Sequence, residues 1–244
     1  MYSQTEKIIY LIGRKLNMRR FFRYFSTIYL PFRHKNAIIL KKLPKDEKMK
    51  KYVIALAGGP ASGKSSVLRA LKNMPTSGDV KVLFLDETAT VFLHNRPQAV
   101  SKLDIQLLRQ HYILKGQCHA ERLLLENCTC AEKPTLLITD RGAIDATVYL
   151  SDEEFKLFEI DAQSLYARYD HAIFLEGERL NFHDDETTTR VETSYEQIAA
   201  LSSRAREKWS LHPSFSVIPQ QNTVEMKTKL VAERINELLG IKVF

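Results

Sequence analysis

The sequence predicts an α/β protein of three layers, in which a parallel sheet of about five strands lies between two layers of helices. Short apolar runs alternate with segments of helical periodicity, which is typical of parallel strands joined by crossover helices. Polar clusters follow several of these runs, at the strand ends where such sheets bind ligands. We predict strands at 53–57, 80–85, 135–139, 172–175 and 215–218, and helices at about 63–71, 101–126, 152–169, 194–209 and 224–239.

A glycine-rich loop follows the first predicted strand and fits the pattern G-x-x-x-x-G-K-[ST]. Its glycines let the backbone curl so that N–H groups point at phosphate oxygens, and the following helix adds its positive end. Lys64 is expected to bridge the β- and γ-phosphates, and the Ser65 hydroxyl to hold Mg²⁺. The pattern therefore predicts binding of a nucleoside triphosphate. The candidate nucleotide-binding residues are Gly58, Gly59, Pro60, Ala61, Ser62, Gly63, Lys64, Ser65 and Ser66.

The second predicted strand ends in an acidic pair, Asp86-Glu87. In a motor-type ATPase such a pair supplies the magnesium ligand and the base that activates water. Here the pair comes soon after the glycine-rich loop and precedes one long helix, which favours a small kinase whose second strand presents an acid to the acceptor hydroxyl. Glu87 would then accept the proton of that hydroxyl. A helix cap or a surface ion pair is the alternative interpretation.

The third predicted strand ends in Asp140, followed by Arg141. A carboxylate at this point can hold Mg²⁺ directly or through water, so that Asp140 and Ser65 are the predicted metal ligands. Arg141 is a candidate for orienting a substrate or a phosphate. The alternative is that Asp140 caps the next helix and Arg141 forms a surface pair.

The polar segment 176–193 follows the fourth predicted strand, where small-molecule kinases have a lid. Positive side chains that such a lid brings to the site stabilise the charge of phosphoryl transfer. Arg190 is the first candidate for this role and Arg179 the second. The acidic run 184–186 would repel phosphates. The alternative to a lid is a solvated loop with unpaired arginines.

The N-terminal extension, residues 1–48, differs in charge from the predicted domain, residues 49–244. Residues 1–51 contain 14 Lys and Arg against 3 Asp and Glu, whereas the remainder contains 22 against 26. The high pI therefore does not indicate a nucleic-acid-binding surface on the body of the protein, and no nucleic-acid partner is expected. The extension is Arg-rich and aromatic, as in a mitochondrial transit segment or a membrane-surface anchor. It could equally form a helix that packs on the domain, or lie outside a protein that starts at Met49.

Three cysteines, Cys118, Cys128 and Cys130, provide no paired disulfide framework, which suits a reducing compartment. Together with His119 they lack the C-x-x-C pairs of structural zinc sites. We therefore predict free, buried thiols.

The order and spacing of these motifs resemble the P-loop kinase-like domain family that includes the ribosylnicotinamide kinase portion of a bacterial NAD regulator and a eukaryotic GTP-binding trafficking protein. The resemblance covers about residues 52–240. It implies a P-loop NTPase of the nucleoside/nucleotide-kinase type with an ATP-binding, phosphoryl-transferring site. The end of the second strand and the Thr-rich segment 176–193 depart from the family pattern, so the acceptor is not implied. The matching motifs are residues 58–66, Glu87-Thr88-Ala89, Asp140-Arg141-Gly142 with Asp145, Arg168-Tyr169-Asp170 and Arg190-Val191-Glu192.

We expect a Mg²⁺-dependent kinase that transfers a phosphoryl group from ATP to a hydroxyl-bearing, nucleoside-like small molecule. A nucleotide-dependent switch with slow hydrolysis, associated with a membrane through the extension, is the alternative. A sugar-nucleotide kinase of the toxin type also stays open. The sequence has no Asn-Lys-x-Asp motif for reading guanine, which favours ATP but leaves GTP open. The expected location is cytoplasmic, or mitochondrial or membrane-peripheral if the extension is an address.

Overall fold

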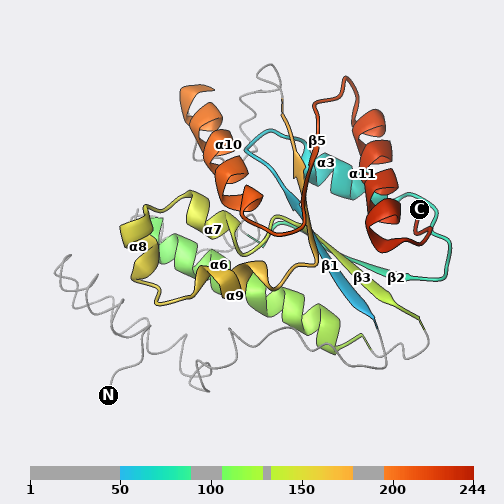
Figure 1. The fold of residues 1–244 in the computed structure, drawn as a ribbon, viewed down its shortest axis with the longest axis horizontal. Helices are drawn as coiled ribbons and strands as arrows, with labels where there is room; N and C mark the ends of the chain where they lie inside the picture. Colours follow the sequence, from blue (N-terminus) through green and yellow to red (C-terminus); the bar gives the residue numbers. More distant parts are fainter. Residues whose placement is uncertain (1–49, 89–105, 129–132, 178–194) are drawn as a thin grey trace, which may run out of the picture.

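The computed structural model describes residues 50–88, 106–128, 133–177 and 195–244. These residues form one parallel sheet with helices on both faces (Figure 1). The strands lie in the order β2-β3-β1-β4-β5, and each neighbouring pair is parallel. The α/β fold class and the number of strands predicted from the sequence are therefore confirmed. The strands are β1 (Lys51–Ala57), β2 (Lys81–Leu85), β3 (Thr135–Asp140), β4 (His171–Leu175) and β5 (Phe215–Ile218).

The two helical layers follow from the alternation of apolar side chains along the strands. In β1, Val53, Ala55 and Ala57 lie in the core under α6, α7, α9 and α10, whereas Ile54 and Leu56 face α3 and α11. Figure 1 shows the same division, with α3 and α11 together on one side of the sheet and the remaining labelled helices on the other. The helices are α3 (Lys64–Lys72), α6 (Gln106–Glu126), α7 (Asp145–Val148), α8 (Asp152–Lys156), α9 (Ala162–Tyr166), α10 (Tyr195–Ser210) and α11 (Val224–Leu239).

The prediction of a single helix over 152–169 is wrong. The structure has two short helices in its place, α8 and α9, preceded by the unpredicted turn of helix α7. Ser151 starts α8 with a capping box, and Glu159 then takes a left-handed backbone conformation with φ 50°. Asp161 caps α9 by accepting hydrogen bonds from the backbone of Gln163 and Ser164. Local capping therefore interrupts a helical pattern that the periodicity alone did not resolve.

Parallel pairing brings the polar strand ends to one edge of the sheet. Leu56 of β1 is in register with Asp140 of β3, and Leu85 at the end of β2 is in register with Thr139. The glycine-rich loop, the acidic pair after β2 and the Asp140-Arg141 turn therefore meet at the carboxyl edge, as ligand-binding sheets require.

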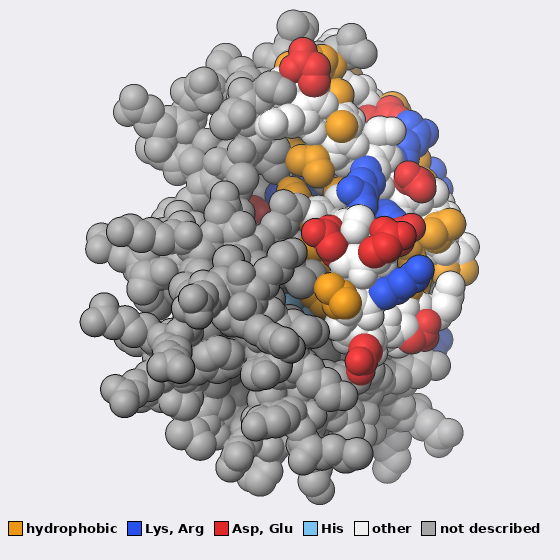
Figure 2. All heavy atoms as spheres, turned by 90° about the vertical axis from the view of Figure 1, so that its left-hand side faces the viewer, with side chains coloured by type: hydrophobic (Ala, Val, Ile, Leu, Met, Phe, Trp, Pro, Cys, Tyr) orange, Lys and Arg blue, Asp and Glu red, His pale blue; other side chains and the backbone are white. Residues whose placement is uncertain are grey.

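The N-terminal extension, residues 1–48, lies outside the described residues, so its separation from the domain stays a prediction. Among the described helices, none combines the length and the apolar character needed to span a bilayer. On the face shown in Figure 2, acidic and basic side chains are interspersed over the described residues.

Candidate functional site

The loop between β1 and α3 has the backbone geometry of a phosphate-binding loop. Gly58 has φ 149° and Gly63 has φ 84°, conformations that L side chains rarely adopt. A Cβ on Gly58 would lie 2.5 Å from Ser62 Oγ and 2.7 Å from the carbonyl oxygen of Leu175, so a larger residue does not fit. Gly63 is the N-cap of α3 and gives no side-chain hydrogen bond to its first turn. The N–H groups of that turn are therefore suited to bind an anion.

The remaining loop residues differ in exposure. Gly59 packs directly against α10, since a Cβ there would lie 1.9 Å from Ser202 Oγ. Pro60 and Ala61 are half-buried, and Ser66 on the first turn of α3 is exposed. The loop is thus fixed on its α10 side and reaches solvent at its tip.

Lys64 is held by the oxygens of its own loop. Its Nζ donates hydrogen bonds to the carbonyl oxygens of Gly58 at 2.9 Å and Gly59 at 2.7 Å, and to Ser62 Oγ at 3.1 Å. Burial and the nearby Arg141 lower the pKa of Lys64 to about 8, although surrounding carboxylates oppose the shift. A bound phosphate would take over these contacts and favour the charged ammonium.

Ser65 and Asp140 come together as the sequence predicts for a metal site. Ser65 Oγ donates to Asp140 Oδ2 at 2.5 Å, and Asp140 is 1% exposed. Its second oxygen, Oδ1, is buried and has no hydrogen-bond partner among the described residues. Burial raises the pKa of Asp140, partly offset by Lys64 and by the Ser65 hydrogen bond.

A hydroxyl beside a carboxylate with an unused oxygen fits Mg²⁺, which prefers oxygen ligands. The described residues contain no group of three or more His, Cys, Asp or Glu side chains that could hold a metal ion by themselves. The arrangement therefore suits an ion that also takes ligands from phosphates and water. Asp140 does not cap a helix, because α7 begins at Asp145 with Ile144 as its N-cap.

The acidic pair after β2 divides into a surface residue and a site residue. Asp86 forms an ion pair with Lys72 at 2.5 Å, and its side chain is 73% exposed. Glu87 turns inward and pairs with Arg141, each side chain about one-fifth exposed. The contact is an ion pair rather than an aligned hydrogen bond, since Arg141 Nε has no hydrogen-bond partner among the described residues.

Arg141 lies in a dense group of charges. Burial disfavours its charge, but Tyr149, Glu87 and Asp145 outweigh burial and raise the pKa of Arg141. The charges of Arg141, Glu87 and Asp145 also act on Lys64. The loops after β2 and β3 are thus close enough to the glycine-rich loop to share one electrostatic environment.

Asp145 is a member of this group that only the family resemblance indicated. It is 5% exposed, and its Oδ2 accepts a hydrogen bond from the backbone of Gly142 at 2.8 Å. Burial raises the pKa of Asp145, while Arg141 and the Gly142 N–H lower it. Asp145 therefore supports the turn after β3 as well as the charge of Arg141.

Lys227 on α11 is a contact of the loop that the sequence reasoning missed. Its Nζ donates to the carbonyl oxygens of Ser62 at 3.2 Å and Glu176 at 2.7 Å, and to Gln220 Oε1 at 2.7 Å. It thereby ties the glycine-rich loop to the ends of β4 and β5. The sequence feature that could have indicated this role is the position of Lys227, four and eight residues before the buried Val231 and Ile235 and next to the buried Thr228.

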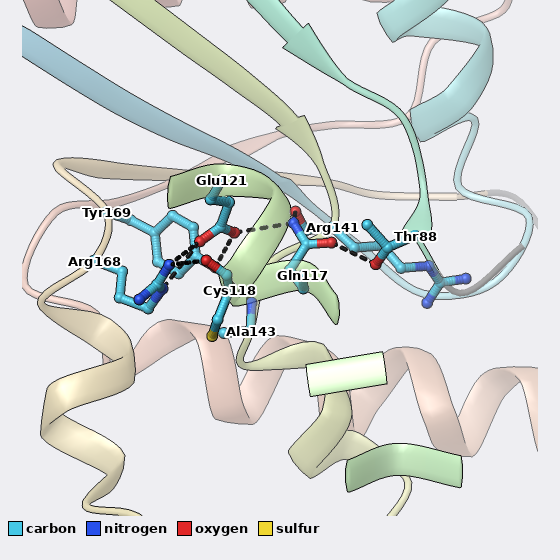
Figure 3. A network of polar contacts seen from close by, with 8 residues as sticks. All are labelled: Thr88, Gln117, Cys118, Glu121, Arg141, Ala143, Arg168 and Tyr169. Atoms are coloured by element: carbon cyan, nitrogen blue, oxygen red, sulfur yellow. Dashed lines mark hydrogen bonds and ion pairs between the residues drawn. The ribbon is translucent and has the colours of Figure 1, made fainter. Parts of the chain in front are cut away.

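A buried polar network adjoins the site (Figure 3). Arg168 and Tyr169 belong to it and were indicated by the family resemblance, whereas Glu121 and Gln117 on α6 were missed. Glu121 on α6 is 0% exposed and accepts two hydrogen bonds from Arg168, at 2.9 and 2.6 Å. Its other oxygen accepts from Tyr169 Oη at 2.8 Å and from Gln117 Nε2 at 2.9 Å. The charge of Glu121 is therefore compensated and both its oxygens are used.

Some predicted residues lie outside the site or outside the described residues. Arg190, Arg179 and the acidic run 184–186 fall in the segment that the structure does not describe. Cys118 and Cys128 are buried and free, as predicted, and burial raises the pKa of Cys118 to about 12. Cys130 also lies outside the described residues.

The chain matches a known family of domains. A family model described as an AAA domain matches residues 53–227. The matched region extends from β1 through the loops after β2 and β3 to Lys227 at the start of α11. No curated protein matches the chain.

Proposed function

Because the chain belongs to this AAA domain family of nucleotide-binding P-loop proteins, we propose that it is a Mg²⁺-dependent kinase acting on a small, hydroxyl-bearing acceptor. The observation that supports this proposal most is the Glu87–Arg141 ion pair at the same sheet edge as Lys64 and Asp140. A site that only binds nucleotide and Mg²⁺ would use Asp140, but it needs no second, half-buried acid such as Glu87 beside the phosphates. An acid and a guanidinium at this point fit the activation of an acceptor hydroxyl and the charge of a transferring phosphoryl group.

The nucleotide would bind with its phosphates in the glycine-rich loop. Backbone N–H groups of the loop and of the first turn of α3 would contact the phosphate oxygens. Lys64 would move from the loop carbonyls to the β- and γ-phosphates, exchanging neutral acceptors for charged ones. The N–H groups and the Lys64 ammonium would then place positive or partly positive groups where the reaction accumulates negative charge.

Ser65 and Asp140 are the residues that would hold Mg²⁺. When bound, the ion supplies charge neutralisation at the β- and γ-phosphate oxygens. The buried, unpartnered Oδ1 of Asp140 would be available to the ion or to its bound water. Asp140 itself must be ionised for this, and the neighbouring Lys64 favours that state.

Glu87 would accept the proton of the acceptor hydroxyl, and Arg141 would contact the transferring phosphoryl group. In the nucleotide-free protein these two side chains neutralise each other. Substrate binding would draw Arg141 toward the phosphates and leave Glu87 available as a base. We propose that the segment 178–194 supplies Arg190 as a further positive side chain for the transferring phosphoryl group.

The same ion pair also favours the second candidate, a nucleotide-dependent switch. A carboxylate that stays paired with a guanidinium is a weak base, because protonation would break the pair. If no acceptor separates Glu87 from Arg141, the site would bind ATP or GTP and hydrolyse it slowly.

The two candidates differ in their response to an acceptor. The full chain is incubated with ATP and Mg²⁺, alone and with a panel of nucleosides, nucleotides and vitamin-like alcohols, and the products are weighed by mass spectrometry. A kinase converts one acceptor to a species heavier by one phosphoryl group. Slow phosphate release that no acceptor accelerates would instead indicate the switch.

A further inference from the structure

The side chain of Gln117 lies between the two loops that contain Glu87 and Arg141 (Figure 3). It is 2% exposed. Its Oε1 accepts a hydrogen bond from Thr88 Oγ1 at 2.7 Å, and Thr88 directly follows Glu87. Its Nε2 donates to the backbone carbonyl of Arg141 at 3.3 Å. One carboxamide on α6 thus connects the loop after β2 with the turn after β3.

The orientation of this carboxamide is fixed by Glu121. Gln117 Nε2 also donates to Glu121 Oε1 at 2.9 Å, and a carboxylate can only accept. The amide nitrogen must therefore face Glu121, and the amide oxygen must face Thr88. Since Arg168 holds the other oxygen of Glu121 in a buried ion pair at 2.6 Å, the anchor is charged and fully paired.

The turn after β3 needs such support because Arg141 has a backbone φ of 70°. For a residue other than glycine this left-handed conformation is strained. The Arg141 N–H donates to the carbonyl oxygen of Leu56 at 3.1 Å, while its carbonyl is held by Gln117. The next two N–H groups are held by Asp145 and by Tyr169 Oη, at 2.8 and 2.5 Å.

We propose that Gln117 is a positioning residue that holds Glu87 and Arg141 opposite each other at the phosphoryl-transfer site. It acts through Thr88 on one loop and through the Arg141 carbonyl on the other, and it does not touch the substrate. Without it, both loops lose a partly buried hydrogen bond, and the turn that aims the Arg141 guanidinium relaxes toward an unstrained φ. The effect on turnover rests on the proposed kinase function, whereas the effect on the two loops does not.

The test uses variants of the full chain that separate positioning from stability. Gln117→Leu removes both connections at similar volume. Thr88→Val removes only the connection to the loop after β2, and Thr88→Ser restores its hydroxyl. Asn236→Leu is the matched control, because the Asn236 carboxamide also makes three hydrogen bonds, to the backbone of Val243 and Phe244, away from the site.

Two quantities are measured on each variant. The first is amide hydrogen exchange in nucleotide-free protein, over residues 84–88 and 139–146. We expect faster exchange in both segments for Gln117→Leu and in 84–88 for Thr88→Val, and wild-type exchange in both segments for Asn236→Leu. Exchange in Gln117→Leu and Thr88→Val that matches wild type would overturn the inference. If Gln117→Leu does not fold, Thr88→Val decides, since it removes a single hydroxyl.

The second quantity is ATP turnover with Mg²⁺, measured with each acceptor of the panel described above. We expect kcat to fall at least about tenfold in Gln117→Leu and Thr88→Val with KM for ATP within about threefold, because binding to the glycine-rich loop is untouched. Thr88→Ser should recover most of kcat, and Asn236→Leu should retain it. An equal loss of kcat in Asn236→Leu would reduce Gln117 to a stabilising residue. If wild type turns over no ATP, the proposed function fails, and hydrogen exchange alone still decides the role of Gln117.

Discussion

The lowered pKa of Lys64 predicts that ATP binding weakens above pH 8. In the free protein the ammonium has a pKa of about 8, because burial and Arg141 disfavour its charge. Bound phosphates favour the charged form and raise this pKa. Well below pH 8 the lysine is already charged and the affinity is at its full value. Above pH 8 binding must take up a proton, so affinity falls as the pH rises.

The size of the effect follows from the pKa of Lys64 in the free protein. Between pH 7 and pH 9 the charged fraction of Lys64 in the free protein falls about tenfold, so Kd for ATP should rise about tenfold, or about 1.4 kcal/mol. The assay is calorimetric titration with ATP and Mg²⁺ at pH 7, 8 and 9. Lys64→Arg is the control, because a guanidinium stays charged throughout this range. A Kd for wild type that stays constant from pH 7 to 9, or that rises equally in Lys64→Arg, would show that the charge of Lys64 does not set the pH dependence of ATP binding.

Three further substitutions test other parts of the site. Glu87→Gln should lower phosphoryl transfer by about 100-fold while Kd for ATP changes by less than about threefold, because a general base acts only in the transition state; the exposed neighbour variant Asp86→Asn should behave as wild type, and equal losses in both would remove Glu87 from catalysis. Asp140→Asn should weaken ATP binding about tenfold in the presence of Mg²⁺ but not in EDTA; weakening of the same size in both media would show that Asp140 does not hold the ion. Lys227→Met leaves the carbonyl of Ser62 without its buried donor. It should lower the free energy of unfolding in urea by about 2 kcal/mol and weaken ATP binding. Unchanged stability would show that the hydrogen bonds of Lys227 do not stabilise the loop.

The sequence predicted the parts of the site that depend on residues close together in the chain. The glycine-rich loop is recognisable because glycines, Lys64 and Ser65 occur at fixed offsets after an apolar strand. The meeting of Ser65 with Asp140 could also be predicted, because parallel strands end at the same edge. The break between α8 and α9 could not, because it depends on the φ of Glu159.

The contacts that the sequence did not predict join residues far apart in the chain. The kinase interpretation selected Glu87 as the site acid. Nothing in the local pattern predicts that Asp86 pairs with Lys72 on the surface or that Glu87 pairs with Arg141. Gln117 lies on a long helix with many polar residues. The sequence alone does not distinguish the polar side chains that are buried from those that face solvent. Such choices are made by tertiary packing rather than by local sequence pattern.

We propose that the γ-phosphoryl group of ATP passes to an acceptor hydroxyl. The most direct measurement follows γ-labelled ATP with Mg²⁺ and the best acceptor of the panel, in wild type and in Glu87→Gln. We predict that wild type moves the label onto the acceptor and that the variant binds ATP but moves the label about 100-fold more slowly. Label that appears only as inorganic phosphate, at a rate that neither the acceptor nor Glu87 changes, would contradict the account.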